Sequence, residues 1–77
     1  MKETLNFIME ELRKAQAKHP IWPDNHHYAV NIVTEECLEA LRASNDGDLV
    51  QLKTELGHTA ATCIRAIMGL GRDGNGK

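Results

Sequence analysis

The sequence predicts an all-α protein of three helices with a short C-terminal tail. Three segments repeat apolar residues every three or four positions, which is the spacing of one face of an α-helix. Prolines and turn-forming residues separate these segments. No segment shows the strict alternation of apolar and polar residues that is typical of a β-strand. We therefore expect one helical domain over residues 1–70 and a flexible tail over 71–77.

The first helix is expected over residues 2–18. Pro20 disfavours helical geometry in the residue before it, so the helix should end near His19. The Pro-Ile-Trp-Pro run then forms a stiff connector, and Asp24 or Asn25 can cap the next helix. The apolar stripe of the first helix consists of Leu5, Ile8, Met9, Leu12 and Ala15.

The second helix is expected over residues 26–44 and the third over 48–70, with turn residues between them. In the third helix, Gly57, Ala60 and Ala61 are small enough to let another helix approach closely. The expected core stripe of the second helix consists of Val30, Val33, Cys37, Ala40 and Leu41. That of the third helix consists of Leu49, Leu52, Leu56, Ala60, Cys63, Ile64 and Ile67.

Charge and hydropathy argue against two classes of partner, nucleic acids and membranes. The 9 basic and 11 acidic residues leave a formal net charge of −2, which argues against a nucleic acid held by its phosphates. No apolar run approaches the roughly 18 residues of a membrane span, and the first residues lack the pattern of a signal peptide. We therefore expect a cytoplasmic protein that acts without a membrane. Cys37 and Cys63 lack a CxxC spacing and are interpreted as small core residues.

The apolar content predicts an oligomer. Leu, Ile, Val and Phe together make up 17 of the 77 residues, which is enough for only a thin core. A short chain of this kind needs further apolar surface from a second chain. We expect a homodimer or a dimer of dimers, in which the second and third helices of one copy pack on those of another.

Two pairs of potential ligands lie on the second and third helices. Glu36 and Glu39 are three residues apart, as are Glu55 and His58, and residues at this spacing stand close together on a helix. Glu36 and Glu55 border the apolar stripes, where burial disfavours a charged carboxylate. Antiparallel pairing of the two helices would bring the pairs together at a divalent cation. The alternative interpretation is that these are ordinary surface acids.

These residues resemble a known family. The similarity lies in residues 18–23, 29–40 and 55–61 and in Arg65, and it covers about residues 5–68. In these segments the chain resembles the short MazG-like proteins of phages and bacteria, within the all-α nucleoside triphosphate pyrophosphatase superfamily. The family motif is Glu-x-x-Glu, a spacer and then Glu-x-x-Asp, and it supplies carboxylates to Mg²⁺. The resemblance implies a four-helix core and hydrolysis of a nucleoside triphosphate to a monophosphate and pyrophosphate.

The resemblance also implies roles for individual residues. His58 stands where the family has Asp, and imidazole suits Mn²⁺ or another transition metal better than Mg²⁺. Glu35 or Glu39 would activate the attacking water. Trp22 is interpreted either as a nucleobase-stacking residue or as a plug between the first two helices, and Arg65 either as a phosphate ligand or as a surface arginine. The implied metal ligands are Glu36, Glu39, Glu55 and His58.

Two other functions fit the same residues. One is a non-catalytic MazG-like module that binds a nucleotide or a protein, which the replacement of the last acid by His58 favours. The other is a redox-active di-metal bundle, because one Glu and one Glu-x-x-His per helix pair, doubled in a homodimer, match the ligand pattern of carboxylate-bridged di-iron proteins. The metal that the purified protein retains would separate these alternatives.

Overall fold

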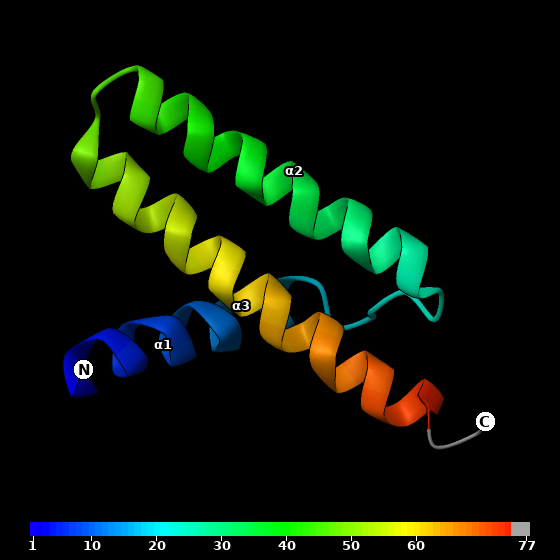
Figure 1. Cartoon of the computed structure of the whole chain (residues 1–77). Coiled ribbons are helices and arrows are strands. Elements are labelled where there is room, and N and C mark those ends of the chain that lie inside the picture. The colour runs from blue at the N-terminus through cyan, green and yellow to red at the C-terminus, as the bar shows by residue number, and fades with distance from the viewer. Residues whose placement is uncertain (75–77) are drawn as a thin grey trace.

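The computed structural model describes residues 1–74, with side chains through residue 70, and within this part it contains three helices and no strand. The helices are α1 (Lys2–Lys18), α2 (His26–Asn45) and α3 (Leu49–Gly74). α3 is the central helix: it packs against both α1 and α2, whereas within this part of the chain no Cα atom of α1 lies within 8 Å of one of α2 (Figure 1). The predicted all-α class is confirmed.

The helix boundaries follow local sequence signals. α1 ends at Lys18, next to the expected His19. Of the two candidate caps for α2, Asn25 is the one used, since its Oδ1 accepts a hydrogen bond of 2.7 Å from the backbone N–H of His27. At the next turn, Gly47 adopts a φ of +72°, a conformation that L side chains rarely adopt. Asp48 then caps α3 by accepting a hydrogen bond from the backbone N–H of Gln51.

The third helix is longer than predicted. α3 continues to Gly74 rather than ending near Leu70, so the expected tail over 71–77 is helical in its first four residues. Gly71 lowers helix propensity by only about 1 kcal/mol relative to alanine, and no proline follows to end the helix. The rest of that tail, residues 75–77, lies outside the described residues.

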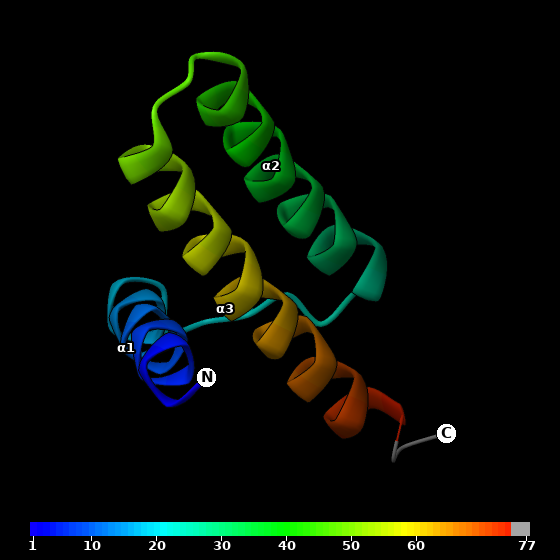
Figure 2. The ribbon, with the colours of Figure 1, turned by 60° about the vertical axis from the view of Figure 1, so that its left-hand side comes forward.

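The helices differ in how they pack on α3. α2 runs antiparallel beside α3, the arrangement that would bring the two pairs of potential ligands together, whereas α1 crosses α3 obliquely (Figures 1 and 2). The first half of α1 lies against the start of α3, and the end of α1 reaches Arg65 further along the same helix. One turn near the middle of α3 therefore lies between α1 on one side and α2 on the other.

The buried core is small and is made mainly of alanine. Leu12 is its only large apolar side chain within the described part; the other buried apolar residues are Ala29, Ala40, Ala43 and Ala61. Gly57 is also buried, and a Cβ at this position would lie 2.6 Å from Cε2 of Phe7 on α1. Gly57 and Ala61 therefore allow close approach of a neighbouring helix, as predicted.

The predicted core stripe of α2 is wrong in its orientation. Val30 and Leu41 of that stripe are exposed and Ala40 is buried as predicted, but the other buried residues, Ala29 and Ala43, lie outside the stripe. The buried face is turned by about 80° from the predicted one, at 100° per residue. Small side chains face α3 because they let the two helix backbones approach, and the larger side chains consequently point outward.

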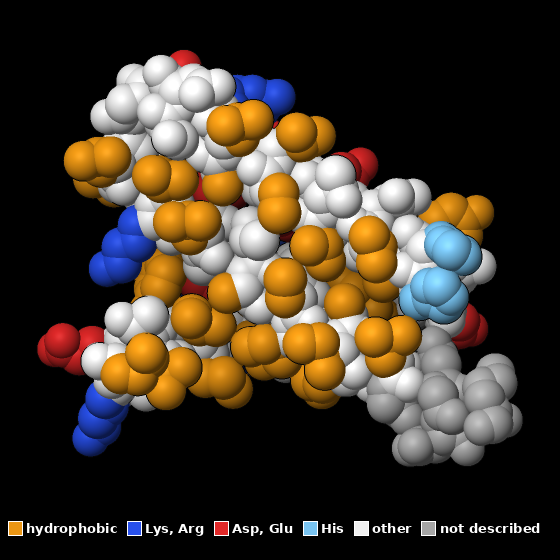
Figure 3. Space-filling view, in the orientation of Figure 1, with side chains coloured by type: hydrophobic (Ala, Val, Ile, Leu, Met, Phe, Trp, Pro, Cys, Tyr) orange, Lys and Arg blue, Asp and Glu red, His pale blue; other side chains and the backbone are white. Residues whose placement is uncertain are grey.

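Large apolar side chains of α2 and α3 point outward, and Figure 3 shows hydrophobic side chains gathered on one side of the molecule. On α3, Leu49 and Ile67 are 73% and 66% exposed although both were expected in the core. Cys37 is likewise exposed, and Cys63 is half-buried, so the prediction that both cysteines are core residues fails for Cys37. In Figure 3, hydrophobic side chains gather over α1, α2 and α3 on this side. We define the apolar face by Val30, Cys37 and Leu41 of α2 and Leu49, Leu56 and Ile67 of α3.

Candidate metal site

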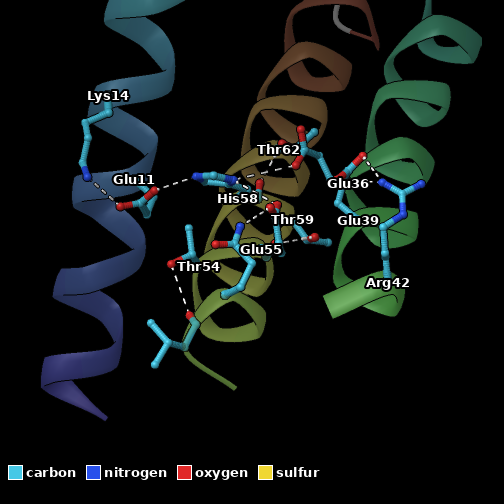
Figure 4. Close-up of polar contacts among 12 residues, drawn as sticks. Glu11, Lys14, Glu36, Glu39, Arg42, Thr54, Glu55, His58, Thr59 and Thr62 are labelled. Atoms are coloured by element: carbon cyan, nitrogen blue, oxygen red, sulfur yellow. Dashed lines mark hydrogen bonds and ion pairs between the residues drawn. The ribbon is translucent and has the colours of Figure 1, made fainter. Parts of the chain in front are cut away.

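Three of the four predicted metal ligands converge between α2 and α3. Glu36 comes from α2, and Glu55 and His58 come from α3 (Figure 4). Each offers one ligand atom, and these three atoms lie within 4.8 Å of one another. Nδ1 of His58 is 3.2 Å from Oε1 of Glu55 and 4.0 Å from Oε1 of Glu36. The antiparallel packing of the two helices brings the two halves of the sequence motif together.

The spacing and chemistry of these groups fit one divalent cation. Two donor atoms that bind one ion at about 2.1 Å can be no more than about 4.2 Å apart. Both distances from Nδ1 of His58 satisfy this limit. All three ligand atoms lie within 4.8 Å of one another, so shifts of less than about 1 Å bring every pair within the limit. Two carboxylates and one imidazole suit Mn²⁺, Fe²⁺ or Zn²⁺ better than Mg²⁺, which prefers oxygen ligands.

Burial alters the charge balance of the site. The pKa of Glu36 is raised above its usual value, first because burial disfavours the carboxylate and then because Glu55, Glu39 and Glu35 place negative charge nearby. His58 acts in the opposite direction and lowers the pKa of Glu36. A bound cation would relieve both the burial penalty and the repulsion.

The fourth predicted ligand does not join this cluster. Glu39 pairs instead with Arg42 on the same helix, at 3.3 Å, and its side chain is exposed. Together with Glu35, these two residues line an open cleft of about 500 Å³ that the three converging residues also line. Glu35 and Glu39, the two predicted bases, therefore lie beside the cluster rather than in it.

One residue of the cluster was not among the predicted ligands. Glu11 of α1 reaches His58 from the side opposite α2, with Oε1 at 3.0 Å from Nε2 (Figure 4). It is only 8% exposed, and its other oxygen pairs with Lys14 at 2.9 Å. A signal was present: with Leu5 as zero, Glu11 lies near 240° on its helix, at the same flank of the apolar stripe where Glu36 and Glu55 lie on theirs.

Trp22 and Arg65, the predicted substrate ligands, lie at the corner between α1 and α2. Arg65 is buried and donates hydrogen bonds to the carbonyl oxygens of Ala15, at 3.3 Å, and His19, at 2.6 Å. Its Cζ lies 4.7 Å from the centre of the Trp22 ring. Neither residue lines the cleft beside the metal cluster. The placement matches the interpretation of Trp22 as a plug, and a role in substrate binding stays a prediction.

We expect Arg65→Ala to lower the free energy of unfolding by about 1.5–3 kcal/mol, because it removes hydrogen bonds from a charged donor to the end of α1. Arg65→Lys should recover only part of this loss, since an ammonium group lacks the planar fork of guanidinium. Denaturant unfolding measures the effect, with the exposed Arg42→Ala as a control that should change stability by less than about 0.5 kcal/mol. Unchanged stability with a raised KM for a nucleotide would assign Arg65 to the substrate instead.

Comparison with models of protein families, with curated proteins and with solved structures found no match for this chain. Of the described residues, none forms a helix with the length and apolarity needed to cross a membrane. Fold and site together thus define an all-helical chain with a candidate divalent-metal cluster. The resemblance to MazG-like proteins depends on the sequence motif alone.

Proposed function

We propose that this chain is a divalent-metal-dependent nucleoside triphosphate pyrophosphohydrolase of the MazG-like type. The observation that carries the proposal is the convergence of Glu36, Glu55 and His58 from the two halves of the motif. Glu-x-x-Glu and Glu-x-x-His pairs occur by chance on many helices, but here Glu36 of one pair meets Glu55 and His58 of the other across a helix interface and beside a cleft.

In the proposed reaction, a water attacks a phosphorus atom of the α–β linkage, and the bond to the bridging oxygen breaks. The products are a nucleoside monophosphate and pyrophosphate. A bound cation would neutralise negative charge on the phosphates. Glu35 or Glu39 takes the proton of the attacking water, and Arg42, which also lines the cleft, supplies positive charge to the phosphate chain. Glu39 would have to leave Arg42 to join the metal ligands.

A second candidate is a binding module without hydrolysis. It is favoured by the pairing of Glu39, a group that hydrolysis would need, with Arg42 on the same helix. Pyrophosphate release separates the two candidates. The measurement uses a panel of nucleoside triphosphates with Mg²⁺, Mn²⁺ or Fe²⁺, and Glu55→Gln serves as the blank. Hydrolysis above the blank supports the enzyme, and nucleotide binding without hydrolysis supports the module.

We also propose that two or more copies assemble through the apolar face. Monomeric proteins rarely expose a contiguous apolar patch of more than a few hundred Å², and covering such a patch stabilises by roughly 25 cal/mol per Å². On each helix the stripe lies about 150–180° around the axis from Glu39 or His58. A second copy seated on the apolar face would therefore complete a four-helix core and leave the cleft open.

The assembly predicts a species larger than a monomer at micromolar concentration in analytical ultracentrifugation. Ile67→Glu should shift this species toward monomer, because it places a charge within the apolar face. Val50→Glu is the matched control: Val50 is also exposed on α3 but lies about 100° from the stripe, so the assembly should persist. A well-folded wild-type monomer at micromolar concentration would contradict the proposal.

A further inference from the structure

We propose that Glu11 is a positioning residue of the metal site, which it serves by holding Nε2 of His58 so that Nδ1 faces the cation. The inference extends the proposed function, since it rests on a metal bound at Glu36, Glu55 and His58. It makes α1 part of a site whose sequence motif lies wholly on α2 and α3. It also accounts for an acidic side chain that is buried in the contact between α1 and α3.

The geometry separates the two nitrogens of His58. Nε2 faces Glu11 at 3.0 Å, and Nδ1 faces Glu55 at 3.2 Å and Glu36 at 4.0 Å. A carboxylate can only accept a hydrogen bond, so Glu11 favours a proton on Nε2 and, without a metal, Glu55 favours one on Nδ1. When a cation replaces the proton on the other side, Nδ1 presents its lone pair to it. A carboxylate on the second nitrogen is the arrangement that orients histidine ligands in many metal sites.

Glu11 is held in place on several sides. Its second oxygen pairs with Lys14 at 2.9 Å, and a Cβ at Gly57 would lie 3.3 Å from its Cγ. With 8% of its surface exposed, the side chain has little room to turn toward solvent. The oxygen that meets Nε2 of His58 is therefore positioned by the packing of α1 on α3, and the imidazole is positioned in turn.

Replacing Glu11 by Gln keeps the size of the side chain and removes its charge. The amide can still accept a hydrogen bond, but it can also turn and donate one to Nε2 of His58, which leaves the proton on Nδ1 and blocks the metal. We expect Glu11→Gln to weaken binding of Zn²⁺ and Mn²⁺ by about 10–100-fold, the usual effect of losing such a partner. Glu10→Gln makes the same change one residue earlier, at an exposed side chain paired with Arg13, and should leave affinity unchanged.

Isothermal titration with Zn²⁺ and Mn²⁺, well below the melting temperature, measures these affinities, and circular dichroism checks that the helices persist. The effect of Glu11→Gln should vanish or reverse in a His58→Asp background, because an aspartate at position 58 has no second nitrogen to hold. A residue that only fastens α1 to α3 would instead weaken metal binding equally in both backgrounds.

A second measurement needs no variant of Glu11. Imidazole ¹⁵N chemical shifts of the Zn²⁺-bound wild type, with the His58→Asp spectrum for assignment, should show metal on Nδ1 and a proton on Nε2. Metal on Nε2, or equal affinities in Glu11→Gln and Glu10→Gln, overturns the inference. Neither readout involves hydrolysis. If the chain binds Zn²⁺ through Nδ1 but releases no pyrophosphate, the proposed activity is contradicted and the role of Glu11 is retained. If the wild type binds no metal, both proposals are contradicted.

Discussion

A divalent cation that binds the folded chain should raise its melting temperature by about 10–20 °C at a hundredfold excess over Kd. Binding to the folded state alone stabilises by about 2.7 kcal/mol at that excess, and each kcal/mol shifts the melting temperature of a domain this small by about 4–8 °C. Differential scanning calorimetry with Mn²⁺, Mg²⁺ or Zn²⁺ at constant protein concentration measures the shift. The reason is electrostatic: Glu36 is partly buried among other carboxylates, and a cation compensates its charge.

Glu36→Gln should abolish this metal response and stabilise the metal-free chain at pH 7. Burial raises the pKa of Glu36, so the folded state holds the proton more tightly than the unfolded state does. The ionised carboxylate therefore opposes folding once the pH rises through its folded pKa. The advantage of the variant should be present at pH 7 and shrink below about pH 4, where glutamate is protonated in the unfolded chain as well.

Glu35→Gln is the matched control for this experiment. It removes the same charge one residue earlier, from an exposed side chain that lines the cleft but lies outside the converging cluster. We expect its metal response to equal that of the wild type. If Glu36→Gln also kept the full metal response, the acidic residues would be ordinary solvated side chains, and the assignment of a metal site to them would be wrong.

The second large effect is expected at His58. Wild-type pyrophosphate release should be slow and should prefer Mn²⁺ to Mg²⁺, because an imidazole replaces the carboxylate that a Mg²⁺ site prefers. His58→Asp adds a hard oxygen ligand and one negative charge. We expect it to raise Mg²⁺-dependent release by at least about tenfold, equivalent to about 1.4 kcal/mol of transition-state stabilisation.

Two further variants keep this experiment interpretable. Glu55→Gln sets the background, since it removes a ligand from the cluster. An aspartate at position 58 would face the buried Glu11, so the same measurement on His58→Asp combined with Glu11→Gln removes that repulsion. If every one of these proteins is as inert as Glu55→Gln with each metal, the chain is not a pyrophosphohydrolase, and the non-catalytic module takes its place.

Some residues of the site were predictable from the sequence and others were not. Glu36, Glu55 and His58 were predictable because each pattern lies within one helix turn, and the flank of an apolar stripe marks side chains near a helix contact. Glu11 also lies at the flank of an apolar stripe, but its helix is outside the sequence motif. Glu39 has the right spacing, yet it pairs with Arg42, since a surface side chain of this length takes whichever partner stands one turn away.

The sequence by itself determined the number of helices and most of their ends. These depend on prolines, caps, turn residues and apolar spacing, all of which act within a few residues of the chain. Only the tertiary structure decided which face of each helix points inward. The hydrophobic effect is non-directional, so an apolar stripe does not specify which surface will cover it. Small residues such as Ala40 pack between α2 and α3, while Leu41 points outward. The same packing brought α1 over Gly57 and placed Glu11 against His58.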